Sequence, residues 1–368
     1  MNKSKKFIIL SDGTIYEGVS FGSDDEALGE IVFNTSMTGY QEMLTDPSYR
    51  GQILVSTFPM IGNYGISDDF NESKNIQVKS YIVRDLCEEP FHYSNSKNLN
   101  QFLLENEIPG IHSVDTRAIT RKIRKFGSKM ALITSDSDIK RAVDKINKFG
   151  SYEDTNYVNQ VSVKQTEAHI VNNSKFRIAL VDFGVKRNII RLLNARGCDV
   201  EIFPWDFDFN NLDLKKFNGI VMSPGPGDPK TLLGNIKGLR KCLESLPTLG
   251  ICLGHQIIAH IYGGETFKLL FGHRGGNQPV KEIESGRVYP TSQNHGYAVS
   301  DKNFPKDLNI THMNINDNTV SGLKHKNKPI ISIQYHSEAC PGPVDSEYIF
   351  DNFIELIKEK EWIVKEGF

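Results

Sequence analysis

The sequence predicts an α/β protein with two domains. In the second half, short apolar runs alternate with helical patterns, which is typical of a doubly wound, mostly parallel sheet with helices on both faces. The first half has hairpin-like strands, many turns and few long periodic segments, so a β-rich α+β domain is expected there. The predicted division is an N-terminal domain over 1–150, an interdomain connection over 151–174 and a C-terminal domain over 175–363.

Apolar runs rich in strand formers indicate the strands of the C-terminal domain, and amphipathic spacing indicates the helices between them. A helical pattern follows the first run and stops at Gly197. The expected strands are 176–183, 199–204, 219–222 and 248–252, and further helices are expected at about 234–245 and 256–262.

Beyond residue 265 the pattern changes to short alternating strands. Gly-Gly, Asn-His-Gly and Asn-Asp-Asn sequences interrupt it, so the stretch 265–335 is expected to be mostly β with turns at these points. A closing helix is expected over 348–358.

The ends of the first domain are marked by two short segments. Lysines precede the apolar run 7–10, but this run is too short for a signal peptide and a turn sequence, SDG, follows it. A first β-strand is therefore predicted. The segment 151–174 is polar, with valine and isoleucine occurring singly, and is predicted to connect the domains.

Composition restricts the class of protein. Hydrophobic residues make up 39% and charged residues 24%, which is typical of a soluble globular protein, and the net charge of −2 indicates neither nucleic acid nor anionic membrane as a partner. No segment approaches the roughly 20 apolar residues that span a bilayer. The five cysteines include no C-x-x-C pair, which argues against disulfides and structural zinc and predicts a cytoplasmic protein. Of these, Cys198 and Cys242 fall in predicted core elements and are expected to be inert.

The run LGICLGHQ, residues 249–256, carries the strongest chemical signal. An apolar strand ends at Cys252, which lies between Gly250 and Gly254, and a helical pattern starts directly afterwards. This is the thiol form of the strained strand-to-helix turn that exposes a nucleophile in G-x-S-x-G enzymes. The helix N-terminus favours the thiolate, so Cys252 is the candidate nucleophile.

A candidate base follows near the end of the chain. An alternating apolar strand is expected to end at His336, and Glu338 lies two residues later. On an extended backbone, residues two apart point to the same side, so the carboxylate could support the imidazole while the imidazole faces the thiol. A histidine at a strand end is more often an ordinary surface residue, and the hypothesis rests on the combination with the elbow.

The loop SPGPGDP, residues 223–229, follows the neighbouring strand. Its glycines let the backbone approach a ligand, so the loop could aim an N–H at a developing oxyanion, with the N–H of Leu253 as the second donor. The alternative is a rigid turn. Neither G-x-x-x-x-G-K-[ST] nor G-x-G-x-x-G occurs, so no nucleotide-phosphate site is predicted.

These motifs resemble a known family. GICLGHQ, SPGPGDP and QYHSEACPGP are similar to the motifs of class I (triad) glutamine amidotransferases. FNTSMTGYQEMLTDPSYRGQI, VDTRAITRKIR, FGHRGGNQPV and QNHGYAV extend the resemblance over the whole chain, to the small, glutamine-hydrolysing subunits of carbamoyl phosphate synthetase.

The resemblance implies a role for each motif residue. Cys252 would attack the glutamine carboxamide and form a γ-glutamyl thioester, His336 would move the protons, and Glu338 would orient His336. Without the resemblance, the sequence 294–296 would be interpreted as a hairpin turn. The implied glutamine contacts are Ser48, Gly225, Gly227, Leu253, Gln256, Asn294, Gly296 and Tyr297.

Three sites depart from the family pattern. Ser337 stands where proline is usual, Cys340 replaces a usual serine, and Arg274 and Gln278 stand where histidines are common. Ser337 matters most, because a proline would stiffen the segment that presents His336, but activity is expected to survive.

The resemblance also implies the partners. ATP and magnesium are expected on a separate large subunit, with no cofactor or metal in this chain, and ammonia would pass from Cys252 to that partner for arginine or pyrimidine biosynthesis. The alternatives are an amidotransferase subunit of another synthase, a stand-alone γ-glutamyl hydrolase, and a non-enzymatic homologue.

Overall fold

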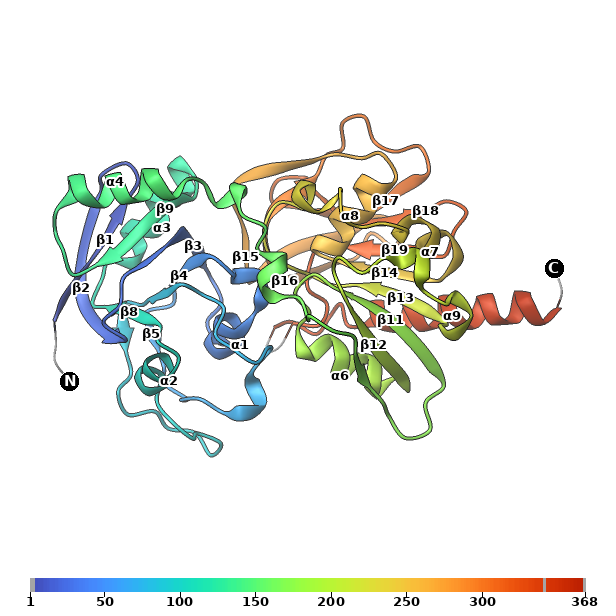
Figure 1. Ribbon diagram of the computed structural model, residues 1–368, viewed down its shortest axis with the longest axis horizontal. Helices are drawn as coiled ribbons and strands as arrows, with labels where there is room; N and C mark the ends of the chain where they lie inside the picture. Colours follow the sequence, from blue (N-terminus) through green and yellow to red (C-terminus); the bar gives the residue numbers. More distant parts are fainter. Residues whose placement is uncertain (1–3, 340–341, 367–368) are drawn as a thin grey trace. The chain divides into compact units, whose positions relative to one another are not determined.

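Seven strands of the first half form a closed β-barrel in the order β1-β2-β8-β6-β4-β3-β9 (Figure 1). The pairs β3–β4, β4–β6 and β6–β8 are parallel and the others are antiparallel. Closure leaves the barrel without unpaired edges. The barrel strands are β1 (Lys5–Leu10), β2 (Ile15–Gly22), β3 (Ala27–Asn34), β4 (Gln52–Ser56), β6 (Ser80–Ile82), β8 (Pro109–His112) and β9 (Lys129–Thr134).

Four helices accompany the barrel: α1 (Tyr40–Thr45), α2 (Leu99–Glu105), α3 (Thr116–Phe126) and α4 (Ile139–Phe149). Two short strands, β5 (Met60–Ile61) and β7 (Asp85–Leu86), pair with each other. The expected first strand and the turn after it are present, since β1 pairs with β2 around residues 11–13. The β-rich content agrees with the sequence-based expectation, whereas barrel closure was not predicted.

The computed structural model describes residues 4–339 and 342–366 and divides into two units, Met1–Tyr157 and Val158–Phe368. The division falls inside the segment 151–174 that was predicted as a connection. Part of that segment is structured, because α5 (Val158–Val161) is helical and β10 (Glu167–His169) pairs antiparallel with β12 (Cys198–Pro204).

The second unit is built on a ten-stranded sheet in the order β10-β12-β11-β13-β14-β19-β18-β16-β15-β17. Its centre, from β12 to β19, is parallel, and the strands on both sides of that centre are antiparallel. The expectation of a mostly parallel sheet therefore holds only for the centre. The remaining strands are β11 (Phe176–Asp182), β13 (Gly219–Met222), β14 (Thr248–Ile251), β15 (Thr266–Glu282), β16 (Val288–Val299), β17 (Leu308–Asn314), β18 (Val320–His325) and β19 (Ile330–Ile333).

Helices pack on both faces of this sheet, as a doubly wound fold requires. One apolar core joins α6 (Arg187–Ala195) and α9 (Tyr348–Glu366) to the sheet through residues such as Leu193 and Phe353. A second core joins α7 (Leu239–Ser245) and α8 (Leu253–Ile261) to the sheet through residues such as Leu243 and Ile257.

Two sequence-based expectations for this unit were wrong in detail. The helix expected at about 234–245 begins only at Leu239, as the shorter α7, because Gly238 directly before it adopts a φ of +76°. The turns expected at the Gly-Gly and Asn-His-Gly sequences are absent: both lie inside the long strands β15 and β16, and a register irregularity after Gly275 accommodates the glycines.

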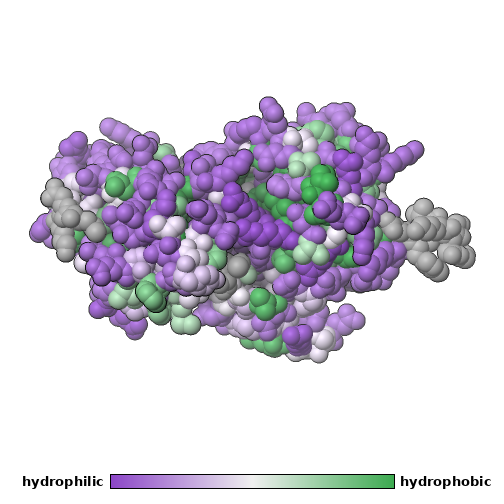
Figure 2. Space-filling view, turned by 90° about the horizontal axis from the view of Figure 1, so that it is seen from below, coloured by the Kyte–Doolittle hydropathy of each residue, from purple (hydrophilic) through white to green (hydrophobic). Residues whose placement is uncertain are grey.

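The face of the molecule in Figure 2 is mostly hydrophilic, with separate hydrophobic residues. Over the described ranges, no helix has the length and apolar character needed to cross a membrane.

Candidate active site

Cys252 lies at a sharp strand-to-helix turn, between β14 and α8. Its φ of +52° and ψ of −102° are a strained conformation for a residue with a side chain. The backbone N–H of Cys252 donates to the carbonyl of Ile333 in β19, 2.8 Å away, which ties the turn to the neighbouring parallel strand. The elbow predicted from the sequence is therefore present.

The two flanking glycines are required by close packing. A Cβ at Gly250 would lie 2.5 Å from the Ile258 side chain, and a Cβ at Gly254 would lie 2.3 Å from the Met222 carbonyl oxygen. The Gly254 N–H also donates to the Ser223 carbonyl at 3.1 Å. Leu253 is the first residue of α8, where the N–H has no acceptor within the helix.

His336 and Glu338 form a buried pair beside this turn. The His336 Nδ1 atom lies 2.6 Å from Glu338 Oε1, and both side chains are almost completely buried. Strand β19 ends at Ile333, three residues earlier than predicted, and Ser337 and Glu338 lie in a turn. The pair is therefore brought together by a turn and by the bridge from His336 to Ser292, not by a continuous strand.

Lys186 is a third member of the charged cluster, and sequence reasoning did not find it. It follows β11, immediately before α6, and its Nζ lies 2.8 Å from Glu338 Oε1, with only 8% of the lysine side chain exposed. The side-chain amide of Asn188 donates to the Glu338 backbone carbonyl. One feature of the sequence could have pointed to Lys186. It follows a predicted parallel strand, so it lies at the carboxyl ends of the strands, as the elbow does.

The cluster determines the charge of each member. Burial and the Lys186 ammonium lower the pKa of His336, but Glu338 and Cys252 raise it more, to a net value of about 10. Burial raises the pKa of Glu338, whereas Lys186 and His336 lower it, to a net value of about 2. At neutral pH the site thus contains an imidazolium, a carboxylate and an ammonium.

The Cys252 sulfur lies among polar groups from two other segments, strand β16 and the segment that follows β19. The Gln334 side-chain amide approaches Sγ at 3.6 Å, and Sγ lies 3.8 Å from the Asn294 carbonyl oxygen. The thiol also interacts with the His336 ring, whose Nε2 has no hydrogen bond to any other group in the described part of the chain. The three residues predicted as a triad are therefore brought together.

The predicted glutamine contacts other than Ser48 lie in the second unit, where Leu253 follows Cys252 directly and the Asn294 carbonyl lies 3.8 Å from its sulfur. Gly225 packs so closely that a Cβ would lie 2.2 Å from the Phe183 carbonyl oxygen, whereas a Cβ at Gly227 would meet open space. The Gln256 amide donates to the Tyr297 carbonyl at 2.8 Å, so those two residues are joined. Asn294, Gly296 and Tyr297 all lie in β16 and not in a hairpin turn.

Ser48 lies in the first unit, in a 3₁₀ turn over Pro47–Tyr49 whose preceding residue, Asp46, accepts the Ser48 backbone N–H at 2.9 Å. Its hydroxyl is buried and has no hydrogen-bond partner among the described residues. Its contact with glutamine stays a prediction.

The remaining departures from the family pattern are placed as follows. Ser337 is buried, and its hydroxyl has no hydrogen-bond partner in the ranges 4–339 and 342–366. Arg274 and Gln278 lie in β15, where Arg274 is paired in register with Asn294. Cys340 lies outside the described residues. Among the residues that are described, no group of three or more histidine, cysteine or acidic side chains could hold a metal ion.

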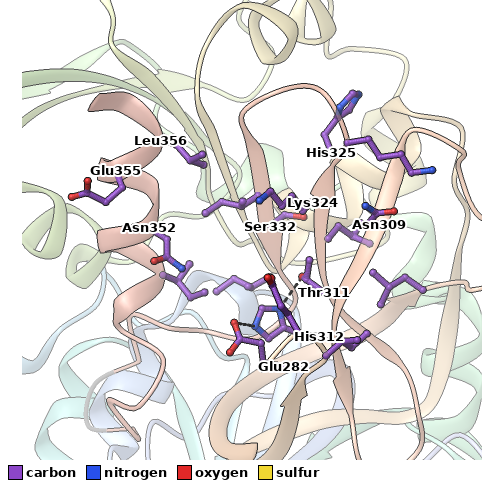
Figure 3. A pocket seen from close by; sticks show the side chains of 18 of the residues that line it. Glu282, Asn309, Thr311, His312, Lys324, His325, Ser332, Asn352, Glu355 and Leu356 are labelled. Carbon is purple, nitrogen blue, oxygen red and sulfur yellow. Dashed lines mark hydrogen bonds and ion pairs between the residues drawn. The ribbon is translucent and has the colours of Figure 1, made fainter. Parts of the chain in front are cut away.

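A separate cavity of about 790 Å³ lies between α9 and strands β17, β18 and β19 (Figure 3). His312 faces Glu282 there, with Nε2 3.9 Å from Oε1. Burial lowers the pKa of His312 to about 4, so the imidazole is neutral at neutral pH and the two do not form an ion pair. None of the predicted catalytic or glutamine-binding residues lines this cavity, so it is not the candidate site.

Comparison with known proteins agrees with the geometry of both units. The model of the class I glutamine amidotransferase family matches residues 179–356, and the model of the carbamoyl-phosphate synthase small chain, CPSase domain, matches residues 8–133. The carbamoyl phosphate synthase small chain of Clostridium acetobutylicum is 45% identical over 357 residues, which cover 96% of this chain and 100% of the relative. This chain belongs to the carbamoyl phosphate synthase small-chain family.

Other small chains have similar identity over similar lengths. The small chain of Archaeoglobus fulgidus is 44% identical and covers 96% of this chain and 99% of the relative. The pyrimidine-specific small chain of Bacillus subtilis is 46% identical and covers 99% of this chain and 98% of the relative. In this chain, the Cys252 elbow lies within the residues that the class I amidotransferase model matches, and the small-chain model matches residues of the first unit.

Proposed function

We propose that this small chain is the glutaminase subunit of a carbamoyl phosphate synthase and that it hydrolyses glutamine at Cys252. The observation that supports this most is the combination of three residues in one buried site: a strained Cys252 at a helix start, the His336 ring beside it, and Glu338 on the far side of that ring.

The reaction follows from the charges of the site. The Cys252 sulfur attacks the side-chain carbonyl carbon of glutamine, and the oxyanion is stabilised by the Leu253 N–H and by a backbone N–H of the 223–229 loop. The imidazolium of His336 donates its proton to the departing nitrogen, which leaves as ammonia while a γ-glutamyl thioester forms. His336 then takes a proton from water and the hydroxide attacks the thioester. Glutamate and one proton leave, and the Cys252 sulfur returns to the thiolate that began the cycle, beside a His336 imidazolium.

Binding of the substrate would use groups that surround this centre. We assign glutamine contacts to Gly225, Gly227, Leu253, Gln256, Asn294, Gly296 and Tyr297, with Ser48 contributed by the first unit. Lys186 holds Glu338 ionised and thereby keeps the His336 ring in one orientation.

The partner assignment rests on the small-chain family. We assign ATP, magnesium and the synthesis of carbamoyl phosphate from bicarbonate to a large chain, to which this chain delivers ammonia in the cytoplasm, and no cofactor to this chain. The name of the Bacillus subtilis relative favours pyrimidine biosynthesis as the destination, and arginine biosynthesis is the other.

The test measures glutamine hydrolysis by the purified chain, alone and with a large chain, ATP and bicarbonate. We expect weak hydrolysis alone, a large increase in the complex, and formation of carbamoyl phosphate. In the complex, Cys252→Ser should reduce glutamine-dependent synthesis at least about 10³-fold and leave synthesis from added ammonia unchanged.

Other outcomes would contradict the proposal. Full hydrolysis that does not respond to the large chain would indicate a stand-alone hydrolase. Loss of both activities in the Cys252→Ser complex would contradict the division of labour between the chains.

A further inference from the structure

The outward face of α3 carries an unusual concentration of positive charge. The helix has the sequence TRAITRKIRKF and contains no acidic residue. Its exposed cations are Arg117, Arg121, Arg124 and Lys125, which recur at spacings of three and four and therefore lie along one side of the helix. We call these four residues the α3 cationic stripe.

The orientation of the stripe is fixed by packing. Ile119 and Ile123 are fully or almost fully buried on the opposite side of the helix, and the Asp115 side chain caps the start by accepting the Ala118 N–H at 2.9 Å. This packing keeps Arg117 and Arg121 on the exposed side of the helix. Like charges four residues apart oppose helix formation, so the stripe carries a small cost in the isolated chain.

Several other surface cations of the first unit have acidic partners. Lys5 pairs with Glu17 at 2.7 Å, and on α4 Lys145 pairs with Glu26 at 2.6 Å. Lys122, on the flank of α3, pairs with Asp12 at 3.0 Å. By contrast, neither Arg117 nor Arg121 has an ion-pair partner within the part of the chain that the structure describes.

We infer that the α3 cationic stripe is a docking surface for a complementary acidic surface on the large synthase chain. This inference rests on the proposed function, because the small-chain family supplies the partner. Arginine is the cation best suited to this role, since its planar guanidinium binds a carboxylate through two hydrogen bonds and is enriched at protein interfaces. A nucleic acid is disfavoured because the whole chain has a net charge of −2.

The test compares two charge reversals of equal size in the full chain. Arg117→Glu with Arg121→Glu changes the stripe, and Lys140→Glu with Lys148→Glu changes α4, where the cations alternate with Asp144. Binding to the purified large chain is titrated at low and high salt. We expect the α3 reversal to weaken binding at least about ten-fold at low salt, with a smaller difference at high salt, and the α4 reversal to change it less than about two-fold.

A second variant distinguishes weaker docking from misfolding of the charge-reversed chain. Arg117→Ala with Arg121→Ala should weaken binding in the same direction by a smaller factor, and the glutaminase activity of the free chain should be unchanged in all variants. Equal binding by the two reversals would overturn the inference while the proposed function stands. Retained large-chain binding together with loss of binding to a DNA duplex would overturn it in favour of nucleic acid. If the unaltered chain neither binds the large chain nor is activated by it, the proposed function itself fails.

Discussion

The charge of Glu338 is balanced by two buried cations, Lys186 and His336, and not by the histidine alone. Removing one partner of a buried ion pair leaves an uncompensated charge and costs about 3–5 kcal/mol in other proteins. Lys186 therefore has a structural reason to be present, which is its ion pair with Glu338. It keeps the carboxylate ionised, and the ionised carboxylate keeps the ring charged.

The raised pKa of His336 makes a prediction about stability and pH. In the unfolded chain the pKa of histidine is about 6.5, whereas in the folded chain that of His336 is about 10. Folding therefore gains stability from the bound proton below about pH 6.5, and this gain is lost as the pH rises to about 10. Urea unfolding of the unaltered chain and of His336→Asn should show a difference in unfolding free energy that shrinks across this range. A difference that grows with pH would show that the ring is neutral when folded.

Ser337 provides a second prediction. Its hydroxyl is buried without a hydrogen-bond partner among the described residues, and the preceding residue, His336, lies in an extended bridge that a following proline tolerates. Ser337→Pro should therefore raise the unfolding free energy by about 0.4–1 kcal/mol and leave glutaminase activity within about two-fold. Thermal unfolding and steady-state kinetics measure both, and a ten-fold loss of activity would show that serine is needed at this place.

At the residue level, the sequence was sufficient for Cys252, His336 and Glu338, because each has a local signature in a motif. It was not sufficient for Lys186. That residue acts through a contact with Glu338, which lies more than 150 residues later, and β11 is separated from β14 by β13 in the sheet. Only the strand order brings these residues together, and no local pattern encodes it.

The β14–α8 turn depends on how closely α8 approaches β13. A methyl group at Gly254 would lie 2.3 Å from the Met222 carbonyl oxygen, which is backbone and cannot move aside cheaply. The start of the helix, and with it the Leu253 N–H, is therefore positioned by the absence of a side chain.

Gly254→Ala should destabilise the protein by about 1–3 kcal/mol and reduce glutaminase activity at least ten-fold. Gly234→Ala is the matched control, because nothing lies within 4 Å of the added carbon and its φ is not positive. That control should change the unfolding free energy by less than about 0.5 kcal/mol. Chemical unfolding and kinetics of the two variants compare them, and equal effects would contradict the packing argument.

Some strands were predicted from the sequence with the right bounds and others were not, for physical reasons. Buried parallel strands such as β11 and β14 are short apolar runs and were found within one residue or two of their bounds. The long pair β15 and β16 was interpreted as several short strands, because glycine and asparagine normally indicate turns. Here the paired strands accommodate those residues through register irregularities, which depend on the partner strand and not on the local sequence.

Of the four cysteines that the structure describes, Cys252 is the one that lies at a strained strand-to-helix turn. Burial raises the pKa of Cys198 to about 12 and that of Cys242 to about 11, which keeps both protonated and confirms that they are packing residues. A glutamine analogue carrying an electrophile should label Cys252 at least about ten times faster than any other cysteine, as mapped by mass spectrometry of the digested chain. Labelling of Cys87 or Cys340 at the same rate would contradict the assignment.

The place of β19 in the sheet has a consequence for biosynthesis. This strand is the last to be made, yet it lies directly beside β14 and supplies the carbonyl that holds the Cys252 N–H. Gln334, which contacts the sulfur, lies 82 residues beyond Cys252. At translation speeds of roughly 5–20 residues per second, the ribosome adds Gln334 on the order of 4–16 s after Cys252. A chain truncated before Gln334 therefore contains Cys252 without Gln334, His336 and Glu338, and we expect such a chain to have no glutaminase activity.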